Sequence, residues 1–170
     1  KGDLANEKRR LQALKEVITA LDLSRNDLHF KFIIINGNAI NGDQACTNEV
    51  LNGIDFKNKY EIVPYNPSPK KVYELIDNAH FVLSVRLHAA IFACFAQTPF
   101  MLVEYHKKCA DFLMDVGVPD EQRVYDLQVP NNIVLDTINA ILDDNSQYKY
   151  PMYTKEMIEK ASLNFTSVKL

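Results

Sequence analysis

The chain has 170 residues, of which 47% are hydrophobic and 24% charged, and it carries a net charge of -3. This size predicts a single domain with a sizeable core, and the charge gives no electrostatic footprint for nucleic acid. No apolar run approaches the ~20 residues of a membrane span, and the polar first residues indicate no signal peptide. The three cysteines lack metal-type spacing and favour a reducing compartment, so we expect a cytoplasmic location.

Helices and strands are expected to alternate along the chain, beginning with an amphipathic helix. Leu11, Leu14 and Ile18 follow helical spacing, whereas residues 33–35 are a continuous apolar run typical of a strand buried on both faces. The expected helices cover residues 4–23, 44–52, 69–78, 89–96, 107–116, 132–142 and 154–165. The expected strands cover residues 30–36, 60–65, 81–85, 98–104 and 123–127. Asp43 and Thr154 are candidate helix caps, and Gly117 predicts a left-handed helix end.

This alternation predicts one α/β domain over residues 1–170, with a doubly wound, mostly parallel sheet and helices on both faces. A doubly wound half normally opens on a strand, whereas this chain opens on a helix. We therefore expect a first strand, or a whole preceding domain, to lie outside these residues. An active site between two domains would then be only half present.

The junction after the strand at 81–85 is the first candidate ligand site. Arg86 and His88 are the only strongly polar side chains between Val85 and Phe95. In open α/β sheets ligands bind at the carboxyl ends of strands, and the first turn of a helix favours an anion there. The planar fork of an arginine suits a carboxylate or phosphate, and a histidine can act as general acid or base. The structural alternative is that Arg86 forms an ion pair and His88 caps the helix.

A second polar cluster, Tyr-His-Lys-Lys at residues 105–108, follows the next strand. Parallel strands would bring this cluster to the same sheet edge as Arg86, where a lysine could complete an anion site as a point charge. The alternative is a solvated loop. The loop at 36–43 would reach that edge too, but it matches neither a dinucleotide fingerprint nor a phosphate loop, and an ordinary turn is the favoured interpretation.

Residues 81–113 resemble the closing part of the polysaccharide pyruvyl transferase family. That family has a strand ending in Arg-Leu-His, an Ala-rich helix, a small-Pro step, a strand ending in Tyr, and a Lys before a Phe-Leu helix. The corresponding residues here are Arg86-Leu87-His88-Ala89, Thr98-Pro99, Tyr105, Lys108 and Phe112-Leu113. One departure is Glu104, a position that is usually small or hydroxylic in the family.

The resemblance implies the C-terminal half of a two-domain GT-B-like transferase, with a missing N-terminal domain. It implies transfer of an enolpyruvyl-derived group from phosphoenolpyruvate to sugar hydroxyls. The product is a pyruvate ketal in exopolysaccharide or cell-wall biosynthesis. Arg86 and His88 would be catalytic, and Leu87, Tyr105 and Lys108 would bind substrate. It implies no metal and no cofactor apart from the donor substrate. The acceptor glycan could be lipid-linked and reached at the inner membrane surface.

Two alternatives remain open. A GT-B glycosyltransferase would use Arg86 and Lys108 to hold the diphosphate of a nucleotide sugar, with Glu104 or Asp126 binding the ribose. The second alternative is a non-catalytic domain on the same scaffold that binds glycan or protein, because a fold does not determine a function.

Overall fold

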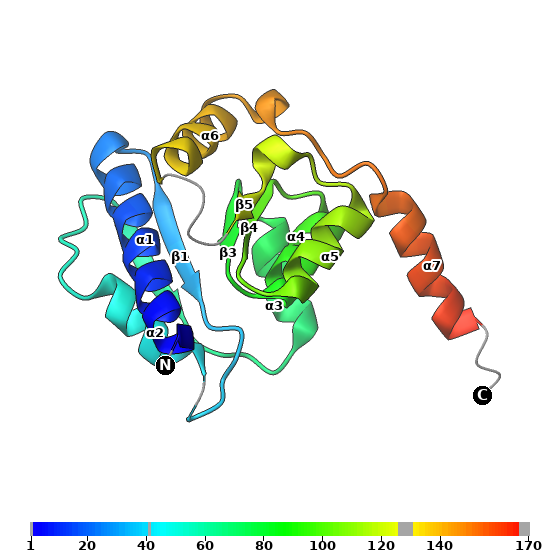
Figure 1. Cartoon of the computed structure of the whole chain (residues 1–170), viewed down its shortest axis with the longest axis horizontal. Coiled ribbons are helices and arrows are strands. Elements are labelled where there is room, and N and C mark those ends of the chain that lie inside the picture. Colours follow the sequence, from blue (N-terminus) through cyan, green and yellow to red (C-terminus); the bar gives the residue numbers. More distant parts are fainter. Residues whose placement is uncertain (1, 41, 126–130, 167–170) are drawn as a thin grey trace. The chain divides into compact units, whose positions relative to one another are not determined.

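The computed structural model describes residues 2–40, 42–125 and 131–166, and helices and strands alternate within them (Figure 1). The α-helices are α1 (Gly2–Ser24), α2 (Asp43–Leu51), α3 (Pro69–Asp77), α4 (Leu87–Ala96), α5 (Lys107–Val116), α6 (Asn131–Asp143) and α7 (Thr154–Thr166). The strands are β1 (His29–Ile33), β2 (Lys59–Val63), β3 (Val82–Ser84), β4 (Phe100–Glu104) and β5 (Val124–Tyr125). Two 3-10 turns are η1 (Asp120–Gln122) and η2 (Asn145–Gln147). The α/β class predicted from the sequence is confirmed. The strand predicted at 123–127 is described only as far as Tyr125.

The described strands form two parallel sheets. β1 pairs with β2 in one sheet, and β4 lies between β3 and β5 in the other. The described residues divide correspondingly into two compact units, 2–72 with 131–140, and 73–125 with 141–166. The five residues to which the family resemblance assigns a role in the site, Arg86, Leu87, His88, Tyr105 and Lys108, lie in the second unit.

The first unit is fixed by a buried polar contact between α1 and the segment before β2. Asp22 is only 1% exposed, and its carboxylate accepts the backbone N–H groups of Lys57 (2.8 Å) and Asn58 (2.9 Å). The Asn58 side-chain amide donates to the same carboxylate at 3.0 Å. Burial by itself would raise the pKa of Asp22, but these hydrogen bonds more than offset it, so the pKa lies below its ordinary value. The ionised carboxylate therefore stabilises this unit.

The second unit is built around β4, whose apolar residues explain its central place in the sheet. Four consecutive side chains of this strand are at most 5% exposed: Phe100, Met101, Leu102 and Val103. Such a run is typical of a parallel strand covered on both faces. α4 contacts β3 and β4, and α5 contacts β4. Ala90 and Ala93 of α4 are fully buried, and their small side chains let the helix lie close to its neighbours.

The ends of α5 and α7 test two of the capping predictions. The left-handed end of α5 at Gly117 is confirmed by its φ of +76°, and a side chain at this position would meet the Tyr153 ring at 2.8 Å. The cap predicted at Thr154 is wrong, because Thr154 is already the first residue of α7. Its buried hydroxyl donates to the Pro151 carbonyl (3.3 Å) and contacts the Cys94 sulfur (3.3 Å).

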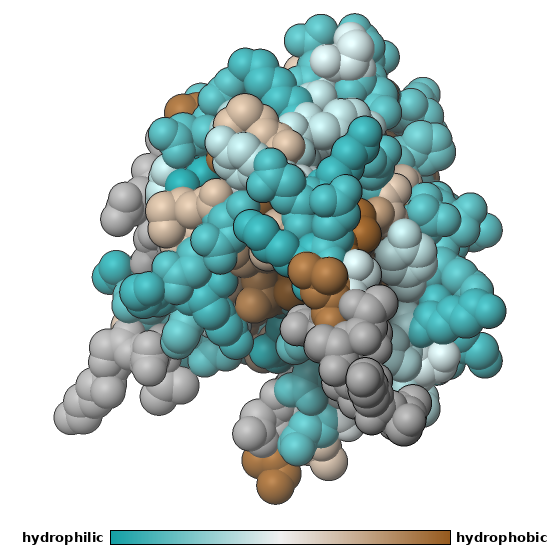
Figure 2. Space-filling view, turned by 90° about the vertical axis from the view of Figure 1, so that its right-hand side faces the viewer, coloured by the Kyte–Doolittle hydropathy of each residue, from teal (hydrophilic) through white to brown (hydrophobic). Residues whose placement is uncertain are grey.

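None of the helices in the described ranges is long and apolar enough to span a membrane. The face shown in Figure 2 is largely hydrophilic, with small hydrophobic areas between the polar residues. Exposed hydrophobic side chains come from several different elements, for example Leu23 of α1, Met114 of α5 and Ile133 of α6.

Candidate functional site

The register of the second sheet brings the two predicted polar clusters to one edge. Ser84 of β3 lies opposite Leu102 of β4, and both strands run in the same direction. The segments that follow these strands therefore leave the sheet at the same end. Arg86, Leu87 and His88 follow β3, and Tyr105 and Lys108 follow β4. The predicted site residues thus lie on neighbouring strand ends, and their roles remain predictions.

The turn from β3 into α4 is shaped by Ser84. This buried hydroxyl accepts the backbone N–H of Arg86 and donates to the Arg86 carbonyl, both at 2.9 Å. A serine that bonds its own neighbourhood in this way sets the chain direction at a strand end. The Ser84 hydroxyl is thus engaged by the backbone of the turn itself.

Arg86 occupies the N-cap position of α4, directly before Leu87, the first helical residue. Its backbone is extended, and its side chain makes no capping hydrogen bond. The first-turn amides of α4 therefore receive no cap from this side chain, and such amides favour an anion. His88 is exposed and is the second residue of α4, whose N-cap is Arg86, so it does not hold the cap position that the structural alternative gave it. Arg86 and Leu87 are half-buried.

The turn from β4 into α5 is held by a backbone hydrogen bond and by a side-chain cap. The Tyr105 N–H donates to the Val103 carbonyl (3.0 Å), so the chain turns sharply after β4. His106 is the N-cap of α5, and its Nδ1 accepts the backbone N–H of Lys108 at 3.3 Å. This geometry requires an imidazole with an unprotonated Nδ1. The Tyr105 ring lies 6.4 Å from the imidazole ring and is half-buried.

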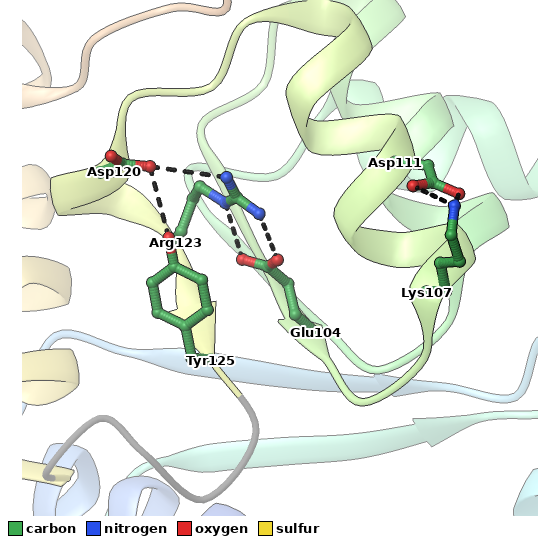
Figure 3. A network of polar contacts seen from close by, with 6 residues as sticks. All are labelled: Glu104, Lys107, Asp111, Asp120, Arg123 and Tyr125. Carbon is green, nitrogen blue, oxygen red and sulfur yellow. Dashed lines mark hydrogen bonds and ion pairs between the residues drawn. The ribbon is translucent and has the colours of Figure 1, made fainter.

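The two lysines at the start of α5 differ in their surroundings. The Lys107 ammonium binds both carboxylate oxygens of Asp111, at 2.8 and 2.9 Å (Figure 3). Lys108 is also exposed, and in the part of the chain that the structure describes no carboxylate lies within ion-pair distance of its ammonium. The charge of Lys107 is thus neutralised at short range, whereas that of Lys108 is available to a ligand.

A network that the sequence did not predict lies beside these residues (Figure 3). The Arg123 guanidinium binds both carboxylate oxygens of Glu104, and the two side chains are only 9% and 3% exposed. Arg123 also approaches Asp120 (3.5 Å) and lies 5.1 Å from the centre of the Tyr125 ring. The hydrogen bond to Glu104 raises the pKa of Arg123, and burial raises the pKa of Tyr125.

This network removes a candidate from the nucleotide-sugar alternative. Glu104 was a possible ribose ligand, but its carboxylate is buried and already binds Arg123 at two points. The other candidate, Asp126, lies outside the described residues.

The loop after β1 is an internally bonded turn in the other unit. Asp43, predicted as a helix cap, is instead the first residue of α2, with Gly42 at the N-cap. The Asp43 carboxylate accepts the N–H groups of Ile35 (3.0 Å) and Asn36 (2.8 Å), which closes the loop. A side chain at Gly42 would meet the Asn38 carbonyl at 2.1 Å, so the chain passes too close for any residue but glycine. These contacts support the interpretation as an ordinary turn.

Comparison with known proteins gives one result that bears on this site. The family model for polysaccharide pyruvyl transferase matches residues 3–107, which is more than half of the chain. The match includes Arg86, Leu87, His88 and Tyr105, and it ends one residue before Lys108. Searches among curated proteins and among solved structures give no significant match. The chain therefore belongs to the polysaccharide pyruvyl transferase family.

Proposed function

We propose that the protein takes part in transferring the pyruvyl group of phosphoenolpyruvate to two hydroxyls of a glycan, where it forms a cyclic ketal. The observation that carries this proposal is the pair of cations, Arg86 and Lys108, that follow neighbouring parallel strands. Phosphoenolpyruvate carries a carboxylate and a phosphate ester on the same carbon. Two cations next to two helix N-termini suit such a doubly anionic ligand.

Each cation has a distinct task in this proposal. The planar guanidinium of Arg86 can hold two oxygens of a carboxylate or a phosphate at once, whereas Lys108 contributes a compact point charge. Lys108 is preferred over Lys107 because Asp111 already neutralises Lys107. Leu87 and Tyr105, both half-buried beside the cations, would line the donor site.

The chemistry requires one proton to be delivered to carbon. The methylene carbon of phosphoenolpyruvate gains a proton while a sugar oxygen forms a bond to the neighbouring carbon. The bond from that carbon to the phosphate oxygen breaks, phosphate leaves with the electron pair, and a second sugar hydroxyl closes the ketal. The two hydroxyl protons balance the new methyl group and the phosphate. His88, exposed in the first turn of α4, would act as the acid or base in these transfers.

We further propose that the chain is the C-terminal half of a GT-B-like transferase with a doubly wound sheet, completed by an N-terminal domain. This proposal rests on the resemblance of residues 81–113 to the closing part of the family. The acceptor would be an exopolysaccharide or cell-wall glycan precursor, and a lipid-linked precursor would be reached at the inner membrane surface.

Turnover by the full-length protein tests the proposal. Phosphoenolpyruvate and lipid-linked oligosaccharides from the organism that encodes the protein would be incubated with it, and phosphate release and the pyruvylated product would be measured. We expect Arg86→Ala and His88→Ala to abolish turnover without unfolding the protein. An inactive wild-type protein, or an active Arg86→Ala variant, would contradict the proposal.

The adjacent lysines offer a matched comparison within the same assay. Lys108→Ala should weaken phosphoenolpyruvate binding about tenfold or more, since a charge-assisted hydrogen bond is worth about 1.5–3 kcal/mol. Lys107→Ala removes the same charge from the same turn, yet it should change binding less than about twofold because Asp111 already neutralises the Lys107 ammonium at short range. Equal losses in the two variants would show that only the net charge matters.

A further inference from the structure

We propose that the buried ion pair between Glu104 and Arg123 is a clamp that positions the donor-binding turn at residues 105–108. Glu104 and Arg123 are then positioning residues, which act through Tyr105 and Lys108 and do not touch the donor. This inference rests on the proposed function for the identity of the ligand. The clamp itself can be tested in the absence of any ligand.

The first argument is the place of Glu104 in the chain. It is the last residue of β4, and Tyr105 and His106 form the whole connection to α5. Only Tyr105 therefore separates Glu104 from His106, the N-cap of the helix that carries Lys108. At its other end the turn is held by Cys109, which is fully buried and donates its N–H to the His106 carbonyl at 2.8 Å.

The second argument is that Arg123 is itself firmly held. It directly follows η1, and its N–H donates to the Asp120 carbonyl at 3.1 Å. The neighbouring Gln122 is 3% exposed, and its side-chain oxygen accepts the backbone N–H of Lys149 at 2.7 Å. The guanidinium thus projects from a turn that is tied to another segment of the same unit. A fixed guanidinium that binds both oxygens of a carboxylate determines the orientation of that carboxylate.

The third argument concerns the place where β4 pairs with β5. Among the described residues, Val124 and Tyr125 of β5 pair with Val103 and Glu104 at the very end of β4. Arg123 directly precedes β5, so its ion pair with Glu104 joins the two strands through side chains beside their paired backbones.

The energetics of buried ion pairs fit a positioning role better than a stabilising one. The free energy needed to remove a guanidinium and a carboxylate from water is about as large as the free energy of their attraction. Replacing such a pair with well-packed apolar side chains is often neutral or stabilising for the fold. Stability alone therefore does not require charges at these positions. A bidentate pair fixes distance and angle, which an apolar contact does not.

The double variant Glu104→Leu/Arg123→Met separates the two roles. It removes both charges and leaves neither one buried alone, so the full-length protein should keep its melting temperature. We expect the amide signals of residues 105–108 to shift or broaden in the ligand-free protein. We also expect the Kd for phosphoenolpyruvate to rise about tenfold or more, as in Lys108→Ala, because the Lys108 ammonium would no longer be held in place for a charge-assisted hydrogen bond. The matched control is Lys31→Ala/Glu61→Ala, which removes an exposed ion pair from the first unit and should change neither readout.

Two results would overturn the proposal. One is a double variant that folds and keeps both the wild-type amide signals at 105–108 and the wild-type Kd. The other is an equal response in the control variant. If the wild type fails to bind phosphoenolpyruvate, the proposed donor is wrong, while the amide signals still decide whether the clamp exists. If the double variant fails to fold, the charge exchange Glu104→Arg/Arg123→Glu provides the second test. Its amide signals at 105–108 should be closer to wild type than those of Glu104→Gln, and the reverse order would refute the clamp.

Discussion

Replacing Ser84 with alanine should loosen the turn that carries Arg86. The hydroxyl accepts the Arg86 N–H and donates to the Arg86 carbonyl, both at 2.9 Å. The carbonyl keeps two other donors, the N–H groups of Ala89 (3.1 Å) and Ala90 (3.3 Å), so loss of the hydroxyl costs little there. The Arg86 N–H loses its acceptor in a partly buried place, and an unsatisfied donor costs about 1–3 kcal/mol. Because the site is only partly buried, we expect Ser84→Ala to lower the free energy of unfolding by about 1–2 kcal/mol, the lower part of that range.

Thermal unfolding and calorimetric titration with phosphoenolpyruvate measure this effect on the same samples. A loss of about 1–2 kcal/mol corresponds to a fall in Tm of roughly 2–8 °C for a chain of this size. Binding should weaken as well, because the Arg86 backbone is no longer fixed. Ser84→Thr keeps the hydroxyl and should fall between the wild type and Ser84→Ala. Ser162→Ala removes an exposed helix hydroxyl and should change stability by less than about 0.5 kcal/mol. A Ser84→Ala protein with the wild-type Tm and affinity would refute the argument.

Three further predictions concern the rest of the described chain. Asp22→Asn leaves one buried N–H without an acceptor and should cost about 1–3 kcal/mol in urea unfolding at pH 7. Because the pKa of Asp22 is lowered in the folded state, its stabilisation is present above about pH 4 and is lost as the pH falls through the folded-state value, so the variant and the wild type should converge in acid. Gly117→Ala imposes a left-handed conformation and a contact with Tyr153, and a melting curve should show a loss of at least about 1 kcal/mol. A thiol reagent should label half-exposed Cys46 in the native protein but not Cys94, whose thiol is buried and has a raised pKa; rapid native labelling of Cys94 would contradict this.

Features determined by neighbouring residues could be predicted from the sequence. The apolar run in β4, the alanines of α4 and the glycine after α5 each define their element through local chemistry, and the structure confirms all three. The site residues were found in the same way, because polar side chains that directly follow apolar strands are visible in the sequence. Their arrangement at one sheet edge then follows from parallel pairing.

Features that depend on partners far apart in the chain could not be predicted. Arg123 and Glu104 are 19 residues apart, and Asp22 and Asn58 are 36 apart, so no local pattern links them. Glu104 looked like a possible ligand because the sequence shows a carboxylate at a strand end but does not show the guanidinium that binds it. The caps at Asp43 and Thr154 were wrong for a related reason, since both side chains bond to groups outside the first turns of their helices.

The central claim is that the residues following β3 and β4 bind phosphoenolpyruvate. The most direct measurement is a calorimetric titration of the full-length protein with phosphoenolpyruvate, with UDP, GDP and CMP, and with inorganic phosphate as the charge control, repeated on Arg86→Ala. We predict saturable binding of phosphoenolpyruvate that is tighter than that of phosphate and is lost in Arg86→Ala. Preferential binding of a nucleotide, or binding of phosphoenolpyruvate that is unchanged in Arg86→Ala, would contradict it.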